Sequence, residues 1–174
     1  GKLDIHEDVF EFREAIEQQS ILLQPLVKEK GIEYLLEFSE DVPAYIIGDK
    51  LRIKQILANL IGNAIKFTEK GEILLSVASA ADPEGDRLRF SILDTGIGIP
   101  DSQHKRIFDN FAQAEESSTR RYGGTGLGLS ICRKIVDAHR GEIRVVRRHN
   151  RTVFQVLLPQ AAAERKPANR QENA

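Results

Sequence analysis

One stretch of the chain, residues 51–68 with the sequence LRIKQILANLIGNAIKFT, carries two patterns at helical spacing. At about 100° per residue its apolar side chains gather on one face, which predicts a helix packed on a core. On another face Asn59, Asn63 and Lys66 follow one another at i, i+4 and i+7, so they form a narrow polar stripe. The apolar face consists of Ile53, Ile56, Leu57, Leu60, Ile61 and Ala64. The rest of the chain must therefore build a core against one side of this helix.

A polar stripe on a helix is commonly just a solvated face, but this one contains two asparagines. Asn costs a helix up to about 0.7 kcal/mol relative to Ala, whereas Glu, Lys or Gln would serve a solvated face at less cost. Amide oxygens can ligate a hard cation, and Mg²⁺ prefers a few protein oxygens together with substrate phosphates. The stripe therefore indicates a divalent ion held beside a phosphate chain, with Lys66 facing the phosphates.

The composition limits the class of protein and of partner. The 174 residues, 41% hydrophobic and 29% charged, suit one α/β domain with its own core. A formal net charge of −1 gives no overall field to attract nucleic acid, which is disfavoured as a partner. Cys132 is the single cysteine, so an internal disulfide is excluded and a reducing compartment is favoured. No run approaches 18 apolar residues, so we expect a soluble piece, although its parent could span a membrane.

The elements before the central helix can be placed from periodicity and from Gly and Pro. We expect a short strand over 6–10, a helix over 12–30 closed by Gly31, and a strand over 32–38. Pro25 predicts a kink or a boundary near Gln24, because an interior proline costs about 3 kcal/mol. Asp49 is placed to cap the central helix. The expected core residues of the first helix are Phe12, Ile16, Leu22, Leu23, Leu26 and Val27.

After the central helix the period changes to that of strands. We expect an antiparallel pair over 72–79 and 87–93, a helix that opens at the glycine-rich segment 123–129 and is stopped by Gly141, and a final hairpin over 142–146 and 152–158. The polar segment 115–121 is a candidate lid. Residues from 160 onward have the composition of a disordered tail.

The glycines do not form either of two familiar nucleotide motifs. A P-loop needs a lysine after its last glycine, but Gly128 is followed by Leu129. The dinucleotide fingerprint also fails, since the spacing in 124–128 is one residue short. What remains is a glycine-rich helix N-terminus, which favours a phosphate chain, although a purely conformational role fits the glycines about as well. Asp94, at the end of a strand, is either a turn residue or an acceptor for an exocyclic amine such as that of adenine.

Four ordered motifs carry a resemblance to a known family. They are Asn59-x3-Asn63-Ala64-x-Lys66-Phe67-Thr68, Asp94-x-Gly96-x-Gly98-Ile99-Pro100, Phe108-x2-Phe111 and Gly124-x-Gly126-Leu127-Gly128-Leu129. In this order they resemble the N, G1, F and G2 boxes of sensor histidine kinases, over about residues 9–159. The resemblance implies a catalytic ATP-binding domain of a two-component kinase, with the fold shared by gyrase, the ninety-kilodalton heat-shock chaperone and mismatch-repair ATPases. That fold is α/β (α+β), a two-layer sandwich of a mixed, largely antiparallel sheet and about three helices with a mobile ATP lid.

The resemblance also implies a role for each matching residue. Asn59 and Asn63 would be Mg²⁺ ligands, Asn63 and Lys66 the catalytic residues, and Asp94 the partner of the adenine amine. Phe108 and Phe111 resemble lid anchors. The residues expected to bind ATP are Asn59, Asn63, Lys66, Phe67, Asp94, Gly96, Gly98, Ile99, Arg120, Arg121, Tyr122, Gly124, Thr125, Gly126, Leu127 and Gly128.

Two differences between this chain and the related proteins bear on which reaction it catalyses. Related ATPases carry a glutamate four residues before the Mg²⁺ asparagine to activate water, and this chain has Asn59 there, an amide that cannot act as a base. Hydrolysis is therefore disfavoured, and the expected reaction is transfer of the γ-phosphoryl group to a histidine. None of the four histidines lies in the acceptor motif of this family. We therefore expect the acceptor on a separate dimerisation segment, of which residues 1–8 are the end of the linker, and no self-phosphorylation by this fragment.

Two other classes of function stay open. A kinase of serine in a partner protein shares this fold, and a nucleotide-sensing domain without turnover would keep the same boxes. As partners the resemblance implies the histidine-bearing dimerisation domain and a response-regulator receiver domain, in a cytoplasmic portion of a homodimeric parent. The fragment alone is expected to be a monomer.

Overall fold

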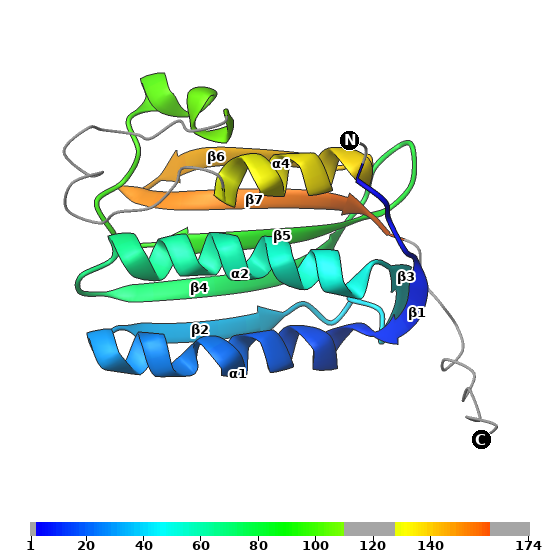
Figure 1. Cartoon of the computed structure of the whole chain (residues 1–174), viewed down its shortest axis with the longest axis horizontal. Helices are drawn as coiled ribbons and strands as arrows, with labels where there is room; N and C mark the ends of the chain where they lie inside the picture. Colours follow the sequence, from blue (N-terminus) through cyan, green and yellow to red (C-terminus); the bar gives the residue numbers. More distant parts are fainter. Residues whose placement is uncertain (1–2, 110–127, 161–174) are drawn as a thin grey trace.

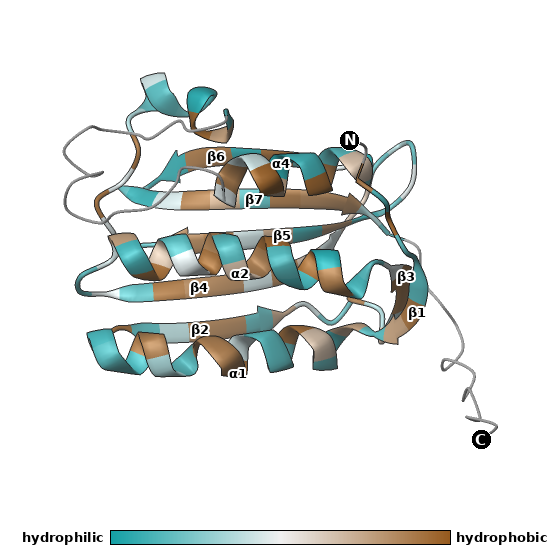
Figure 2. Cartoon of the chain, in the orientation of Figure 1, coloured by the Kyte–Doolittle hydropathy of each residue, from teal (hydrophilic) through white to brown (hydrophobic). Residues whose placement is uncertain are grey.

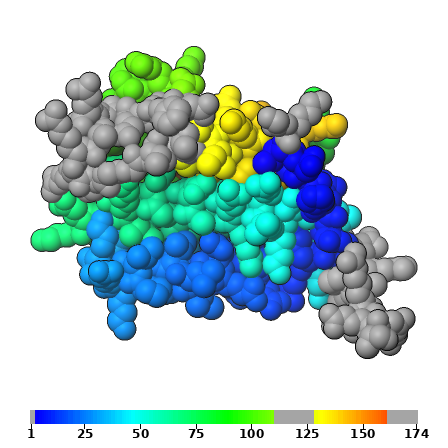
Figure 3. Space-filling model, in the orientation of Figure 1, coloured from blue at the N-terminus to red at the C-terminus, as the bar shows by residue number. Residues whose placement is uncertain are grey.

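The computed structural model describes residues 3–109 and 128–160, and these form two layers. One layer is a five-stranded sheet, and the other consists of helices α1 (Phe12–Lys30), α2 (Lys50–Phe67) and α4 (Gly128–Ala138). The helices lie side by side on one face of the sheet, with α2 between α1 and α4 (Figure 1; Figure 3). The expected α/β sandwich with three helices is therefore confirmed.

The sheet joins two hairpins through a central pairing. Its strand order is β2 (Glu33–Phe38), β4 (Glu72–Ala80), β5 (Arg87–Asp94), β7 (Arg151–Pro159) and β6 (Glu142–Arg148). β2 runs parallel to β4, and every other neighbouring pair is antiparallel. The mixed, largely antiparallel sheet and both expected hairpins are thus confirmed. The pairing of β5 with β7 places the end of β5 beside the turn of the last hairpin.

Helix α2 follows the sequence expectation closely. All six residues of its expected apolar face are buried, and Ile65 joins them. The Asp49 side chain accepts a hydrogen bond from the Arg52 backbone N–H at 3.1 Å, so Asp49 caps the helix as expected. Figure 2 shows apolar and polar residues alternating along α2, as a half-buried helix requires.

Helix α1 differs from its expectation in two respects. It spans 12–30 as expected and continues through Pro25, so of the two expected alternatives, a kink or a boundary near Gln24, the boundary is wrong. The proline lies on the exposed side of α1, where water can reach the Ile21 carbonyl that loses its partner. Leu22 and Leu26 are 70% and 48% exposed, so the expectation that they belong to the core is wrong.

The expected core of α1 is otherwise buried. Phe12, Ile16, Leu23 and Val27 are all in the core, and Gly31 ends α1 in the left-handed conformation at φ 69°.

A small second sheet was only half expected. β1 (Asp8–Glu11) pairs antiparallel with β3 (Tyr45–Gly48), whereas the sequence predicted a strand over 6–10 and a loop before Asp49. Four residues after Pro43 are too short for a clear alternating pattern, so β3 is formed by its pairing with β1 rather than by a local signal.

Between β5 and α4 the structure describes two short helical turns, η1 (Asp101–Gln103) and η2 (Arg106–Phe108). The candidate lid over 115–121, Phe111 and the tail from 161 lie outside the described residues. The β6–β7 turn has His149 and Asn150 at φ 48° and 60°. None of the helices in the described part of the chain is long and apolar enough to cross a bilayer.

Candidate functional site

The polar stripe of α2 faces the first residue of α4. The Asn59 side-chain N–H₂ donates to the carbonyl oxygen of Gly128 at 3.4 Å. Asn59 and Asn63 are both half-buried and lie one turn apart. The expected amide pair and the glycine-led helix start are thus brought together, although they are 69 residues apart in the chain.

Lys66 and Phe67 continue this stripe at the end of α2. The Lys66 Nζ lies 5.5 Å from the centre of the Phe67 ring, over its face. Lys30 of α1 donates to the carbonyl oxygens of Ile65 and Lys66 at 2.6 and 3.1 Å, so a cation occupies the negative end of the α2 dipole. The last turn of α2 is therefore fixed from outside the site, and the Lys66 ammonium lies beside an aromatic ring.

Asp94 ends β5 in a buried position. It is 6% exposed, and its Oδ1 accepts a hydrogen bond from the Gly96 N–H at 2.9 Å. Burial raises the pKa of Asp94 to about 6, and the Gly96 hydrogen bond opposes part of that rise. A carboxylate that is nearly dry and has one backbone donor can accept a further hydrogen bond from a bound amine.

The turn after Asp94 is tied to the end of α2. The Ile97 N–H donates to the Phe67 carbonyl oxygen at 3.3 Å. A Cβ on Gly96 would lie 2.4 Å from the same oxygen, so only glycine fits this close approach. Gly98 has a φ of 79°, which also favours glycine. The glycines of the second motif therefore hold Asp94 against the C-terminal end of the asparagine helix.

The loop after this turn packs onto the fold rather than into the site. The Ile99 carbonyl oxygen and the His104 Nε2 lie 2.9 Å apart, and Ile99 packs against the core. Phe108 is buried edge-on against Phe154, with ring centres 6.3 Å apart. Phe108 thus packs on the sheet as a lid anchor would.

Two threonines beside Asp94 were not assigned a role from the sequence. Thr152 of β7 pairs with Asp94 of β5 and is 6% exposed. Thr68 is fully buried, and its Oγ1 has no hydrogen-bond partner among the described residues. Thr68 is the last residue of the first motif, and that position could have indicated from the sequence that it belongs to the site. Thr152 has no local signal, because the β5–β7 pairing alone brings it to Asp94.

Part of the expected site lies outside the described residues: Arg120, Arg121, Tyr122, Gly124, Thr125, Gly126 and Leu127. The described site thus contains two amides, a lysine, a buried carboxylate and one glycine of the last motif.

A nucleotide-binding ATPase is the class of protein that this fold and this site define. The chain matches the family model described as "Histidine kinase-, DNA gyrase B-, and HSP90-like ATPase" over residues 48–162. The chain belongs to this family, and the resemblance seen in the four motifs is confirmed.

Curated relatives and solved structures agree with this family. The chain is 40% identical over 167 residues to the sensory/regulatory protein RpfC of Xanthomonas campestris, covering 94% of this chain and 23% of RpfC. It is 43% identical over 152 residues to the signal transduction histidine-protein kinase BarA of Escherichia coli, covering 87% of this chain and 17% of BarA. The chain therefore spans less than a quarter of the length of these two relatives.

Three solved structures, of the two proteins ShkA and ThkA, have the same fold. Full-length ShkA in complex with AMPPNP superposes with a TM-score of 0.80 at 34% identity, over 94% of this chain and 33% of that chain. The catalytic domain of ThkA superposes with a TM-score of 0.74 at 33% identity, over 91% and 97% of the two chains. ThkA has also been solved with the response regulator TrrA, and in that structure it superposes with a TM-score of 0.74 at 29% identity, over 92% of this chain and 44% of that one.

Proposed function

We propose that this chain binds Mg-ATP and transfers the γ-phosphoryl group to a histidine on a separate dimerisation domain of its parent two-component kinase. The observation that carries the proposal is the convergence of three motifs on the C-terminal half of α2. Asn59 contacts Gly128 at the start of α4, and Gly96 packs on the Phe67 carbonyl beside the buried Asp94. The AMPPNP complex of ShkA supports an adenine nucleotide as the ligand.

The residues at the site fit a magnesium ion that is shared with phosphates. Asn59 and Asn63 offer neutral amide oxygens on adjacent turns, and an octahedral ion would draw its remaining oxygens from phosphates and water. Bound there, the ion would neutralise charge that builds up on the phosphates. The backbone N–H groups at the start of α4 and the Lys66 ammonium would hold the phosphate chain. Asp94 would accept a hydrogen bond from the adenine amine.

The proposed reaction needs no base from this chain. In the transfer, the bond from the γ-phosphorus to the β–γ bridging oxygen breaks and its electrons leave with ADP, while one nitrogen of the neutral acceptor imidazole forms a bond to the γ-phosphorus. The proton on the other ring nitrogen then passes to water. The chain supplies position and charge, chiefly through Asn63 and Lys66. Asn59 stands where hydrolytic relatives carry a glutamate, so transfer is favoured over hydrolysis.

The partners follow from the same proposal. They are the dimerisation domain of the parent, taken to be a homodimer in the cytoplasm, and a response-regulator receiver domain, as in the ThkA–TrrA complex. Residues 1–8 would lead from that dimerisation segment, 9–159 would be the catalytic domain, and 160–174 a tail. The net charge of −1 gives no support for a nucleic-acid partner.

The experiment mixes this chain with the dimerisation segment of its parent and with ATP labelled at the γ-phosphate. We expect acid-labile label on the segment and none on the chain alone. Asn63→Ala and Asp94→Ala should each lower the rate at least about tenfold, the loss expected for about 1.4 kcal/mol. Lys54→Ala is the matched control on the same helix, because its side chain contacts Gln18 of α1 and not the site.

The outcomes separate the alternatives. Acid-stable label on a partner protein would indicate a serine kinase of the same fold. Binding of Mg-ATP without any transfer would indicate a nucleotide-sensing domain, and absence of Mg-ATP binding in a calorimetric titration would overturn the proposal.

A further inference from the structure

Helices α2 and α4 contact each other through a small polar cluster beside the nucleotide site. The Asn59 side-chain N–H₂ donates to the Gly128 carbonyl oxygen at 3.4 Å, and the Cys132 Sγ–H donates to the Ile56 carbonyl oxygen at 3.8 Å. Because residue 128 lies opposite 59 and residue 132 opposite 56, α4 runs antiparallel to α2. Two groups of α4 therefore lie against the one turn of α2 that ends at Asn59.

Cys132 is fully buried in this contact, and its thiol stays protonated at neutral pH. The side chain is 0% exposed, and burial raises the pKa of the Cys132 thiol to about 11. A hydrogen bond from the Asn59 carboxamide opposes part of that rise in pKa. Only a donor has this effect, so the Asn59 N–H₂ and not its oxygen faces the sulfur. Since the S–H points at the Ile56 carbonyl, the lone pairs of the sulfur accept from Asn59.

The two groups of α4 allow the Asn59 carboxamide one orientation. A carbonyl oxygen can only accept a hydrogen bond, so the Gly128 carbonyl must face the Asn59 N–H₂ group and not Oδ1. The Cys132 sulfur faces the same group, which has an N–H bond for each of the two acceptors. Because Cys132 is buried, the N–H₂ group points inward, and Oδ1 lies on the outward side of the carboxamide.

This orientation matters because an asparagine ligates a metal ion only through its oxygen. The amide nitrogen has no free lone pair, and rotation of the carboxamide by half a turn would present that nitrogen in place of Oδ1. Partners outside a metal site commonly fix the orientation of its ligands. We propose that Cys132 is a positioning residue, which together with the Gly128 carbonyl holds the Asn59 oxygen toward the nucleotide site. The use of that oxygen as a Mg²⁺ ligand rests on the proposed function.

Simple core packing is the alternative role for Cys132, since a buried cysteine behaves as a small apolar residue. Core packing needs only volume, whereas positioning needs a donor and an acceptor at this place. Alanine and serine separate the two roles, because they are nearly equal in size and differ by a hydroxyl group. Cys132→Ser keeps a donor for the Ile56 carbonyl and an acceptor for Asn59, and Cys132→Ala keeps neither. Alanine is also the better helix former, so the alanine variant should be at least as stable as the serine variant.

The first measurement uses the chain without metal or nucleotide. It follows by NMR the exchange with water of the Asn59 side-chain amide protons, which are assigned by their loss in Asn59→Ala. Cys132→Ala should speed this exchange about two- to tenfold, the factor expected for one lost hydrogen bond. Cys132→Ser should restore slow exchange, although it is no more stable than the alanine variant.

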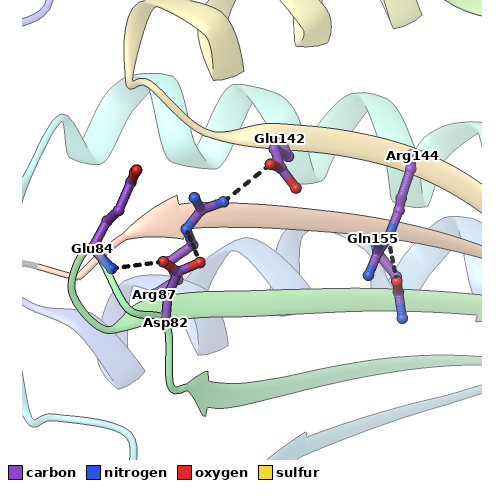
Figure 4. Close-up of polar contacts among 6 residues, drawn as sticks. All are labelled: Asp82, Glu84, Arg87, Glu142, Arg144 and Gln155. Carbon is purple, nitrogen blue, oxygen red and sulfur yellow. Dashed lines mark hydrogen bonds and ion pairs between the residues drawn. The ribbon is translucent and has the colours of Figure 1, made fainter.

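The chain offers a reference amide and a control variant for this measurement. Gln155 lies on the face of the sheet away from the helices, and its Oε1 accepts from the Arg144 Nε at 2.8 Å (Figure 4). Its side-chain amide should exchange at the same rate in every Cys132 variant. Ile135→Val removes a methyl group from the buried face of α4 about one turn beyond Cys132. It should lower the denaturation midpoint without changing exchange at Asn59.

The second measurement tests whether Cys132 acts through Asn59. Calorimetric titrations of ATP with and without MgCl₂ give the metal-dependent part of the affinity. Cys132→Ala should reduce that part by the same factor, about two- to tenfold, and leave the affinity without Mg²⁺ unchanged. In the Asn59→Ala background the same substitution should reduce it no further, because no carboxamide is left to position.

The outcomes separate this proposal from the proposed function. Equal exchange of the Asn59 amide in the cysteine, serine and alanine proteins would overturn the positioning role of Cys132. An equal loss of metal-dependent affinity with and without Asn59 would overturn it too. If the wild-type chain binds no Mg-ATP, the proposed function fails, whereas exchange in the metal-free chain still decides whether Cys132 holds the carboxamide.

Discussion

A methyl group on Gly96 would lie 2.4 Å from the carbonyl oxygen of Phe67 and 2.9 Å from the Thr68 Oγ1. The turn that holds Asp94 is thus packed directly on the end of the asparagine helix. Gly96→Ala should lower the free energy of unfolding by about 1–3 kcal/mol, because backbone atoms have to move. It should also weaken ATP binding, since the turn and α2 separate. Chemical denaturation and a calorimetric titration measure the two effects.

Gly62→Ala is the matched control for this substitution. A Cβ at Gly62 meets no atom within 4 Å, and Gly62 lies inside α2. Alanine should therefore raise the free energy of unfolding by about 0.5–1 kcal/mol. If both substitutions destabilise equally, close packing at Gly96 is not the cause.

The protonation of Asp94 predicts a pH dependence of ATP binding. The ionised carboxylate accepts a stronger, charge-assisted hydrogen bond from the adenine amine than the protonated carboxyl does. Burial raises the pKa of Asp94 to about 6. Affinity should therefore fall as the pH drops below about 6, by up to about tenfold per pH unit. Titrations from pH 5 to 8 test this, and Asp94→Asn, which cannot ionise, reports any contribution from the phosphates themselves. Equal profiles for both proteins would contradict the prediction.

Asp94 should also make stability depend on pH. Its pKa in the folded chain lies above the ordinary value of 3.8 for an aspartate, so the folded chain holds the proton more tightly. The free energy of unfolding should then fall as the pH rises from about 4 to about 6 and stay lower above that. Asp94→Asn should remove this fall and raise stability at pH 7 by at most about 3 kcal/mol. Denaturation midpoints across pH measure it.

Removing the Thr68 hydroxyl should have opposite effects on the stability of the chain and on its binding of ATP. Its Oγ1 is buried without a partner among the described residues, which costs free energy in the unbound chain. Thr68→Val keeps the shape and removes the hydroxyl, so it should raise the free energy of unfolding by about 1 kcal/mol. If the hydroxyl binds water or nucleotide beside Asp94, the same variant should bind ATP more weakly, with Thr68→Ser as the control that keeps the hydroxyl. A destabilised valine variant would contradict the assignment of an unpaired hydroxyl.

The sequence correctly predicted the helices and strands that have a long amphipathic or alternating pattern of their own. Helix α2 has eighteen residues with a buried face and a capping aspartate, and both appear in the structure as expected. Both hairpins have clear alternation and turn residues. Where the signal is short, as in the four residues of β3, pairing with β1 decides the structure and the sequence alone does not.

The errors in α1 have one physical cause. Apolar residues fall on more than one side of this helix, so periodicity could not tell which side meets the sheet. Tertiary packing buries Leu23 and Val27 and leaves Leu22 and Leu26 exposed. Prediction of the site from sequence is limited in the same way, because Thr152 lies beside Asp94 only through the register of β5 with β7.

The Asp49 carboxylate accepts one hydrogen bond from the start of α2 and one from the N-terminal segment. Substitutions at Asp49 should distinguish the contributions of these two hydrogen bonds to stability. Oδ1 accepts from the Arg52 N–H at 3.1 Å and caps α2, while Oδ2 accepts from the His6 N–H at 2.9 Å. Asp49→Ala loses both bonds and should lower the free energy of unfolding by about 1–2 kcal/mol. Asp49→Asn keeps one acceptor oxygen and should lose less, because Asn also caps helices well.

Amide hydrogen exchange distinguishes the two contributions at Asp49. In the alanine variant both the His6 and Arg52 amides should exchange faster. In the asparagine variant the Arg52 amide should stay protected while the His6 amide exchanges faster, since the side-chain N–H₂ cannot accept from it. Equal loss of protection at Arg52 in both variants would mean that the charge of Asp49, acting on the α2 dipole, stabilises the helix start more than the capping bond does.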